Sequence, residues 1–289
     1  MSMNLQKIET TTDLTKEEFI EKYFIPQKPV VIKNASKNWP ANQKWDLNFM
    51  KEIAGDKVVP LYDNRPIDPK SKFNSPHAEM KMSDYIDLLK KEPTEYRIFL
   101  WNILKAVPEL QNDFKYPDYG LTFLKSIPTL FFGGTNSFTF MHYDIDLANI
   151  FHYHFDGKKQ CILFDQNQNN YLYKVPNSLL TLRDIDFSNP NLEKWPALKN
   201  ASGYITDLEH GDMLYIPEGY WHYMKYITPG FSMSLRTIPK KPKNLAKAVY
   251  NIVVMRNIEN LMRKTLGEKW MNWKYKKAIS DTHKLNNLA

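Results

Sequence analysis

The feature that most constrains the fold is a series of short, aromatic-rich segments in the second half of the chain. Glycine, proline, asparagine or aspartate separates each segment from the next, as is typical of strands joined by turns. The segments expected to form strands are 137–142, 150–155, 160–165, 171–175, 213–216, 222–227 and 231–237. Many short strands at close spacing predict a β-sandwich or β-barrel.

Mixed helices and strands are expected before this region. Apolar residues recur at helical spacing in three stretches, and two β-branched runs between them are typical of buried strands. The expected helices are 15–20, 46–55 with Gly55 at the end, and 82–90 with Ser83 as the N-cap, and the expected strands are 29–32 and 57–62. The chain is therefore predicted to be mainly β with flanking α elements.

The segment after Pro239 changes character and is predicted to be helical. Its apolar residues step by three or four positions, which predicts an amphipathic helix with a wide apolar stripe. The stripe consists of Leu245, Ala248, Val249, Ile252, Val253, Met255, Ile258 and Met262. Gly267 is expected to end this helix, and a second helix is expected around 270–275. We therefore divide the chain into a domain at 1–239 and a C-terminal helical segment at 240–289.

Positive charge is concentrated in that C-terminal segment. Residues 240–289 contain 12 lysines and arginines against 3 acidic residues, whereas the whole 289-residue chain has a formal charge of only +7. A general polyanion-binding surface on the main domain is therefore disfavoured. Two interpretations stay open for the basic tail: it solvates the outer faces of helices, or it contacts an acidic partner or RNA.

Composition excludes several classes of protein. The chain is 43% hydrophobic and 25% charged, which is typical of an ordered globular protein. Cys161 is the only cysteine, so no intrachain disulfide can form, and a cytoplasmic location is expected. No run of 18 apolar residues occurs, and residues 1–12 lack the pattern of a secretory signal, so no membrane association is expected.

Two histidines and one aspartate form the candidate metal site. His142 and Asp144 alternate at the end of one expected strand, so their side chains can point to the same side, and His222 begins another. Two imidazoles and one carboxylate on one face of a metal leave open positions, the arrangement of non-haem Fe(II) oxygenases. Asp146 could replace Asp144 as a ligand. A second metal site at His152 and His154 is disfavoured, because no carboxylate is clearly placed beside them.

Several motifs in a fixed order surround these residues. They are Lys28-Pro29-Val30-Val31-Ile32, Asn38-Trp39-Pro40, Lys44-Trp45-Asp46-Leu47, the His-x-Asp pair at 142–144, the segment 157–164, and Gly-Asp-Met-Leu-Tyr-Ile-Pro at 211–217. With this set the chain resembles, over about residues 15–240, the cupin-like JmjC-type Fe(II)/2-oxoglutarate oxygenases. The branch contains an asparaginyl hydroxylase and a tRNA wybutosine hydroxylase. The resemblance implies a double-stranded β-helix, or jelly roll, and Fe(II) held by His142, Asp144 and His222.

The resemblance also implies residues that bind the cosubstrate 2-oxoglutarate. Thr139 and Lys159 match the family's partners for its distal carboxylate, and Asn149 approximately matches a polar neighbour. Arg236 stands where relatives carry asparagine; it is expected either to share in carboxylate binding or to form a salt bridge at the rim. Phe99 replaces a family tyrosine, so one hydrogen bond is missing, and Lys159 lies about two residues farther from His142 than in close relatives.

The predicted function is that of a 2-oxoglutarate-dependent hydroxylase whose substrate is a protein, a tRNA or a small molecule. One alternative is a catalytically silent cupin-like module that binds RNA or an acidic protein. Another is a cupin that uses the same ligands for a different metal reaction. The apolar stripe predicts a homodimer built on residues 240–280, because a barrel can cover only part of it.

Overall fold

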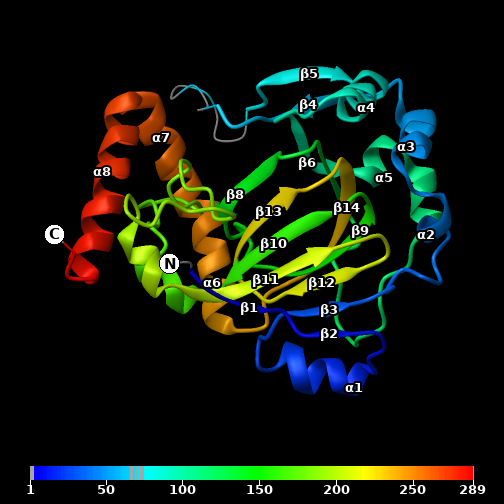
Figure 1. Cartoon of the computed structure of the whole chain (residues 1–289), viewed down its shortest axis with the longest axis horizontal. Helices are drawn as coiled ribbons and strands as arrows, with labels where there is room; N and C mark the ends of the chain where they lie inside the picture. Colours follow the sequence, from blue (N-terminus) through cyan, green and yellow to red (C-terminus); the bar gives the residue numbers. More distant parts are fainter. Residues whose placement is uncertain (1–2, 66–67, 69–70, 72–74, 289) are drawn as a thin grey trace.

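Two facing β-sheets form the centre of the molecule (Figure 1). The computed structural model describes residues 3–65, 68, 71 and 75–288. The five-stranded sheet has the order β1 (Asn4–Lys7), β11 (Ser202–Leu208), β10 (Lys159–Phe164), β13 (Trp221–Tyr226) and β8 (Phe138–His142). The seven-stranded sheet has the order β2 (Thr10–Thr11), β3 (Val30–Ile32), β12 (Met213–Ile216), β9 (Asn149–Asp156), β14 (Gly230–Thr237), β7 (Thr129–Gly133) and β6 (Arg97–Asn102). Strands distant in sequence are neighbours in both sheets, which confirms the predicted jelly roll.

Side chains alternate between the inside of the jelly roll and its outer faces, as the two-residue period of a strand requires. On β9, Phe151 and Tyr153 pack outward into a large aromatic core, whereas His152 lines the interior. On β14, Met233 faces that core and Ser234 lines the interior. Nearly all residues of these two central strands are buried. Their outer faces are apolar, whereas part of their inner faces is polar.

N-terminal elements cover the outside of the seven-stranded sheet (Figure 1). They are α1 (Lys16–Phe19), a π-helical turn (Ile20–Phe24), α2 (Pro40–Lys44), α3 (Leu47–Ala54), β4 (Val58–Leu61), β5 (Ala78–Lys81), α4 (Met82–Lys91), α5 (Ile103–Ala106) and a 3₁₀ helix (Pro108–Asp113). Phe19 lies 5.6 Å from Phe151 and Trp45 lies 4.8 Å from Phe155 between ring centroids. These aromatic contacts attach the N-terminal layer to β9.

Three of the expected local features differ in the structure. Ser83 does not cap α4, because the helix already begins at Met82 and the N-cap position is Lys81. The expected strand at 171–175 is a turn that makes only isolated bridges, and Tyr173 has φ 52°, which a strand cannot adopt. Strand β11 was not predicted, because a glycine and half-exposed residues obscure its alternation.

The C-terminal helices continue from the jelly roll rather than standing apart from it. They are α6 (Pro242–Tyr250), a π-helical turn (Asn251–Met255), α7 (Arg256–Leu266) and α8 (Glu268–Leu285). Ala248 and Met255 are buried in the core outside the five-stranded sheet, while Leu245, Val249 and Ile252 are exposed. The predicted apolar stripe is thus split between an inner and an outer face. No helix in the described part of the chain is long and apolar enough to cross a membrane.

Candidate functional site

A cavity of about 380 Å³ opens between the two sheets. Its inner wall includes Lys159, Tyr226 and Thr139, and its middle contains the three candidate metal ligands. Loop residues 177–180 and 183 line the cavity as well, together with Met255, Arg256 and Glu259 of the C-terminal helices. The site is therefore built by the jelly roll and the C-terminal segment together.

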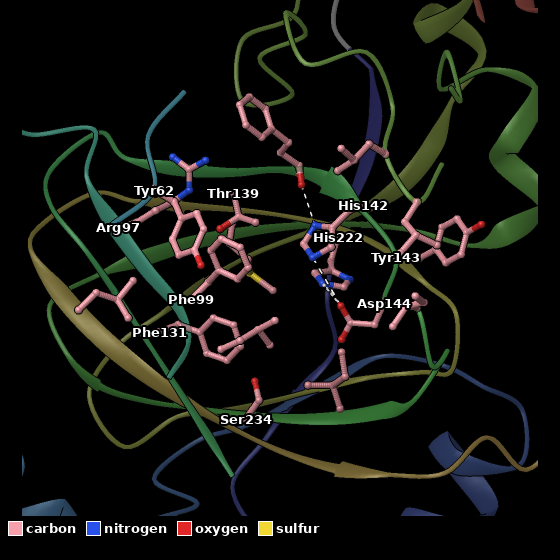
Figure 2. A pocket seen from close by; sticks show the side chains of 18 of the residues that line it. Tyr62, Arg97, Phe99, Phe131, Thr139, His142, Tyr143, Asp144, His222 and Ser234 are labelled. Carbon is pink, nitrogen blue, oxygen red and sulfur yellow. Dashed lines mark hydrogen bonds and ion pairs between the residues drawn. The ribbon is translucent and has the colours of Figure 1, made fainter. Parts of the chain in front are cut away.

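His142, Asp144 and His222 converge in this cavity (Figure 2). His142 and His222 are opposite each other in the register of β8 and β13, and their ring centroids are 4.1 Å apart. Asp144 follows β8 and places Oδ1 3.5 Å from Nε2 of His142 and 3.8 Å from Nε2 of His222. One ligand atom from each residue lies within 4.8 Å of the others, and no second group of three such residues occurs in the described part of the chain.

Backbone carbonyls fix the orientation of both imidazoles. Nδ1 of His142 lies 2.7 Å from the carbonyl oxygen of Phe140, and Nδ1 of His222 lies 3.2 Å from that of Tyr220. A carbonyl oxygen only accepts, so each Nδ1 carries the proton and donates it. Nε2 is then the unprotonated nitrogen on both rings and faces Asp144. This arrangement is the one that metal-binding histidines adopt.

The charge states of His222 and Asp144 also suit a cation. Burial lowers the pKa of His222 to about 3, with a further contribution from His142, so the ring is neutral at neutral pH. Burial alone would raise the pKa of Asp144, but the adjacent Arg236 guanidinium holds it well below its usual range. Two imidazoles and one carboxylate form a donor set that fits a divalent iron ion.

Arg236 and Asp146 lie behind the ligands. Arg236 forms a buried ion pair with Asp144 at 2.8 Å and contacts Asp146 at 3.3 Å. Asp146 also accepts a hydrogen bond from the backbone N–H of Ala148 and does not line the cavity. The structure therefore groups Asp144, and not Asp146, with the histidines. Arg236 thus forms the expected salt bridge, and because it also lines the cavity, its share in carboxylate binding stays a prediction.

Lys159 is fully buried on the inner wall, with 1% of its surface exposed. Its Nζ lies 2.8 Å from Oγ of Ser232, 3.2 Å from Nε2 of His152 and 4.2 Å from the ring centroid of Tyr226. An ammonium group has three N–H donors, so two are used by protein acceptors and one is left. Burial lowers the pKa of Lys159 to about 7. This lysine can donate to an anionic group in the cavity.

His152 and His154 take part in hydrogen bonding instead of forming a second metal site. Nδ1 of His152 pairs with Oγ of Ser234 at 2.8 Å, and Nδ1 of His154 pairs with Oγ of Ser232 at 2.7 Å. Burial lowers the pKa of both rings, so both are neutral. Their alternation with aromatic residues was visible in the sequence, but their serine partners lie about 80 residues away on β14.

The remaining predicted cosubstrate residues separate into two groups. Thr139 and Phe99 line the cavity, and the ring of Tyr62 lies against that of Phe99 at a tilt of 45°, with ring centroids 4.0 Å apart (Figure 2). Tyr62 therefore supplies a phenol beside the phenylalanine that replaces the family tyrosine. Asn149 does not line the cavity, because its amide oxygen accepts from the Tyr215 hydroxyl at 2.8 Å and its amide nitrogen donates to the backbone.

A family of domains and several named proteins are similar to this chain over most of its length. Residues 15–255 match the family described as Cupin-like domain. Lysine-specific demethylase JMJ30 of Arabidopsis thaliana is 27% identical over 81% of this chain and 55% of its own length. Lysine-specific demethylase 8 of Xenopus tropicalis is 26% identical over 75% of this chain and 50% of its own length.

A further relative carries a different name. The tRNA wybutosine-synthesizing protein 5 of Gallus gallus is 26% identical over 78% of this chain and 75% of its own length. This chain thus spans about half the length of the two demethylases and three quarters of the wybutosine protein. The family match extends past Pro239 to Met255, a residue that lines the cavity. With its jelly roll and its two-histidine, one-aspartate centre, the chain belongs to the family of cupin-like, JmjC-type domains.

Proposed function

We propose that this protein is an Fe(II)- and 2-oxoglutarate-dependent oxygenase that hydroxylates a C–H bond of its substrate. The convergence of His142, Asp144 and His222 in the cavity between the two sheets is the observation that carries the proposal. With iron bound, such a site supplies an oxidant from O₂ while 2-oxoglutarate is converted to succinate and CO₂. The family membership and the names of the relatives support the same activity.

Different residues of the chain would bind the metal and the cosubstrate. His142, Asp144 and His222 would hold the metal, and Arg236 would keep Asp144 ionised and correctly oriented. Lys159 and Thr139 would hold the distal carboxylate of 2-oxoglutarate at the inner end of the cavity, because an unpaired carboxylate there would be strongly disfavoured. The apolar walls, which include Phe99 and Phe131, exclude water from the reacting centre.

Succinate formation tests this activity against a catalytically silent module and against a cupin with other chemistry. Purified protein with Fe(II) and 2-oxoglutarate is expected to form succinate slowly without substrate, and His142→Ala is expected to abolish it. His142→Ala is preferred to Asp144→Ala, because it leaves the buried Arg236 with both of its carboxylate partners. Equal succinate formation by the wild type and His142→Ala would contradict the proposal.

A binding measurement separates loss of activity from loss of fold. Calorimetry with Mn(II) and then N-oxalylglycine, an unreactive analogue of 2-oxoglutarate, is expected to show ordered binding to the wild type. The His142→Ala variant should keep its thermal midpoint within a few degrees and lose Mn(II) binding. A wild type that binds neither ligand would favour the silent module.

We also propose that the protein is a homodimer formed through residues 240–280. Val249 and Val253 are 55% and 58% exposed, whereas the inward residues Asn244 and Asn251 are polar and buried. Helices that leave part of their apolar stripe facing outward are unfavourable in water unless another surface covers that part. One self-complementary patch on two copies meets this need.

Because the only cysteine of the chain, Cys161, is buried and free, a reducing compartment such as the cytoplasm suits the chain.

A further inference from the structure

Two arginines line the cavity without a carboxylate partner. Arg97 on β6 is 5% exposed. Its guanidinium donates to Oδ1 of Asn64 at 2.9 Å. It also donates to the backbone carbonyl oxygens of Asp63 at 3.1 Å and Glu95 at 3.4 Å. In the described part of the chain, Arg183 donates to one acceptor, the backbone carbonyl oxygen of Arg65, at the long distance of 3.5 Å. Among the described residues, no carboxylate oxygen lies within 4.0 Å of either guanidinium.

The two guanidiniums are held close together around one aromatic ring. The central carbon of Arg97 lies 5.3 Å from the centroid of Phe140, and that of Arg183 lies 4.8 Å from it. Burial lowers the pKa of each arginine to about 10, and Arg183 contributes further to the shift of Arg97. Both are therefore still charged at neutral pH. Two like charges near each other in a partly dry cavity are unfavourable without an anion between or beside them.

Each acidic residue of the cavity already pairs with another cation, although the charge of Asp63 also raises the pKa of Arg97. Asp63 pairs with Arg65 at 2.6 Å, Glu259 pairs with Lys274 at 2.7 Å, and Asp144 pairs with Arg236 at 2.8 Å. Lys159 adds a further cation at the inner end. The cavity consequently has more positive than negative charge, and the excess is centred on Arg97 and Arg183.

Phe140 connects this pair of arginines to the metal ligands. It lies two residues before His142 on β8, where the pairing with β13 shifts register, and both residues line the cavity. Its carbonyl oxygen also accepts the hydrogen bond from Nδ1 of His142. A group held by the arginines would thus lie in the same cavity as the metal centre.

We infer that Arg97 and Arg183 bind an oxyanion of the substrate, a phosphate or a carboxylate, in the cavity that also contains the metal centre. This inference rests on the proposed function and names the class of its substrate. Planar guanidiniums bind both oxyanions through paired N–H donors. They repel a cation, so a methylated lysine, the substrate implied by the names of the demethylase relatives, does not fit this cavity.

Calorimetry on the full chain tests the inference. Mn(II) and N-oxalylglycine are bound first, so that the part of the cavity beside Lys159 is occupied. Inorganic phosphate and acetate are the two anion probes and trimethyllysine is the cation probe, all at constant ionic strength. Arg183→Gln is the test variant, because Arg183 makes one long hydrogen bond to the described residues besides its contact with Phe140, whereas Arg97 makes three hydrogen bonds. Lys199→Gln, an exposed residue outside the cavity, is the control with the same loss of charge.

The wild type and Lys199→Gln are expected to bind at least one anion saturably, and Arg183→Gln is expected to bind it at least about tenfold more weakly. The stronger probe identifies the oxyanion as phosphate or carboxylate. Equal anion binding by the wild type and Arg183→Gln, no anion binding by the wild type, or tighter binding of trimethyllysine would overturn the inference. A tenfold loss of N-oxalylglycine affinity in Arg183→Gln would also overturn it, by assigning the arginine to the cosubstrate. Failure of Mn(II) and N-oxalylglycine to bind the wild type would instead contradict the proposed function.

Discussion

At the scale of single residues, Lys159 combines complete burial with an amine that can carry a positive charge. Ser232 and His152 accept two of its N–H donors, and the ring of Tyr226 lies against it. Burial nevertheless lowers its pKa from the ordinary 10.5 to about 7. In the free protein the lysine therefore changes its charge within the physiological range, whereas a bound carboxylate would favour the ammonium form.

The affinity for N-oxalylglycine is accordingly expected to depend on pH. Below pH 7 the ammonium is already formed, so Lys159 makes the affinity for N-oxalylglycine no more dependent on pH. Above pH 7 the lysine must take up a proton on binding, so the affinity should fall by up to about tenfold per pH unit. Calorimetry from pH 6 to pH 9, in buffers of different ionisation enthalpy, measures both the slope and the proton uptake.

Lys159→Met provides the control, because methionine fills a similar volume without a charge. This variant should bind N-oxalylglycine much more weakly at pH 6.5, show no proton uptake, and keep the Mn(II) affinity of the wild type. An unchanged affinity in Lys159→Met would assign the distal carboxylate to other residues.

At the scale of elements, Glu218 attaches the C-terminal helices to the jelly roll. Helix α6 has no side-chain cap of its own at Lys241. The Glu218 carboxylate accepts instead from the backbone N–H groups of Lys240 and Lys241 and from the Asn244 amide, the last at 3.0 Å. A carboxylate at the N-terminus of a helix also interacts favourably with the helix dipole.

Glu218→Ala is expected to lower the free energy of unfolding by about 1–3 kcal/mol, because it leaves several donors unsatisfied. Hydrogen exchange should increase most in residues 242–266, while β9 and β14 stay protected. Glu218→Gln keeps one acceptor oxygen, so its effect should be smaller. Uniform loss of protection across the sheets would mean that α6 and the jelly roll unfold as one unit.

At the scale of the whole molecule, the exposed apolar face of the C-terminal helices predicts the oligomeric state. Val249→Glu combined with Val253→Glu is expected to convert a dimer of twice 34.1 kDa into a monomer, because two charges would face each other across the interface. Both side chains are more than half exposed, so the fold should be unaffected. Light scattering measures the mass.

The structure also decides which variants test the dimer. Met255 belongs to the sequence stripe but is 8% exposed and lines the cavity, so a glutamate there would damage the site rather than the interface. Neutralising Lys240, Lys241 and Lys243 by glutamine is the control and should leave the dimer intact. A wild type that stays at 34.1 kDa over a wide concentration range would contradict the homodimer.

The strands and the metal-ligand triad were predictable from the sequence because both depend on local patterns. Alternation along a strand determines which side chains share a face, so β9, β12, β13 and β14 were found nearly to their ends. His142 and Asp144 share a face for the same reason, and the structure groups them with His222. Phe99 and Lys159 could be placed only through the family motifs, and both line the cavity.

Tertiary structure alone decided the features that depend on contacts between distant segments. Arg97 and Arg183 meet around Phe140, although 86 residues separate them, and no local pattern marks either as part of a site. Helical periodicity showed that the C-terminal segment has an apolar stripe. Which side of the helix faces the jelly roll was set by polar groups of the jelly roll, such as Glu218 and the carbonyl of Ile145. A buried donor or acceptor must find a partner, and in this chain the partners come from elements far apart in sequence.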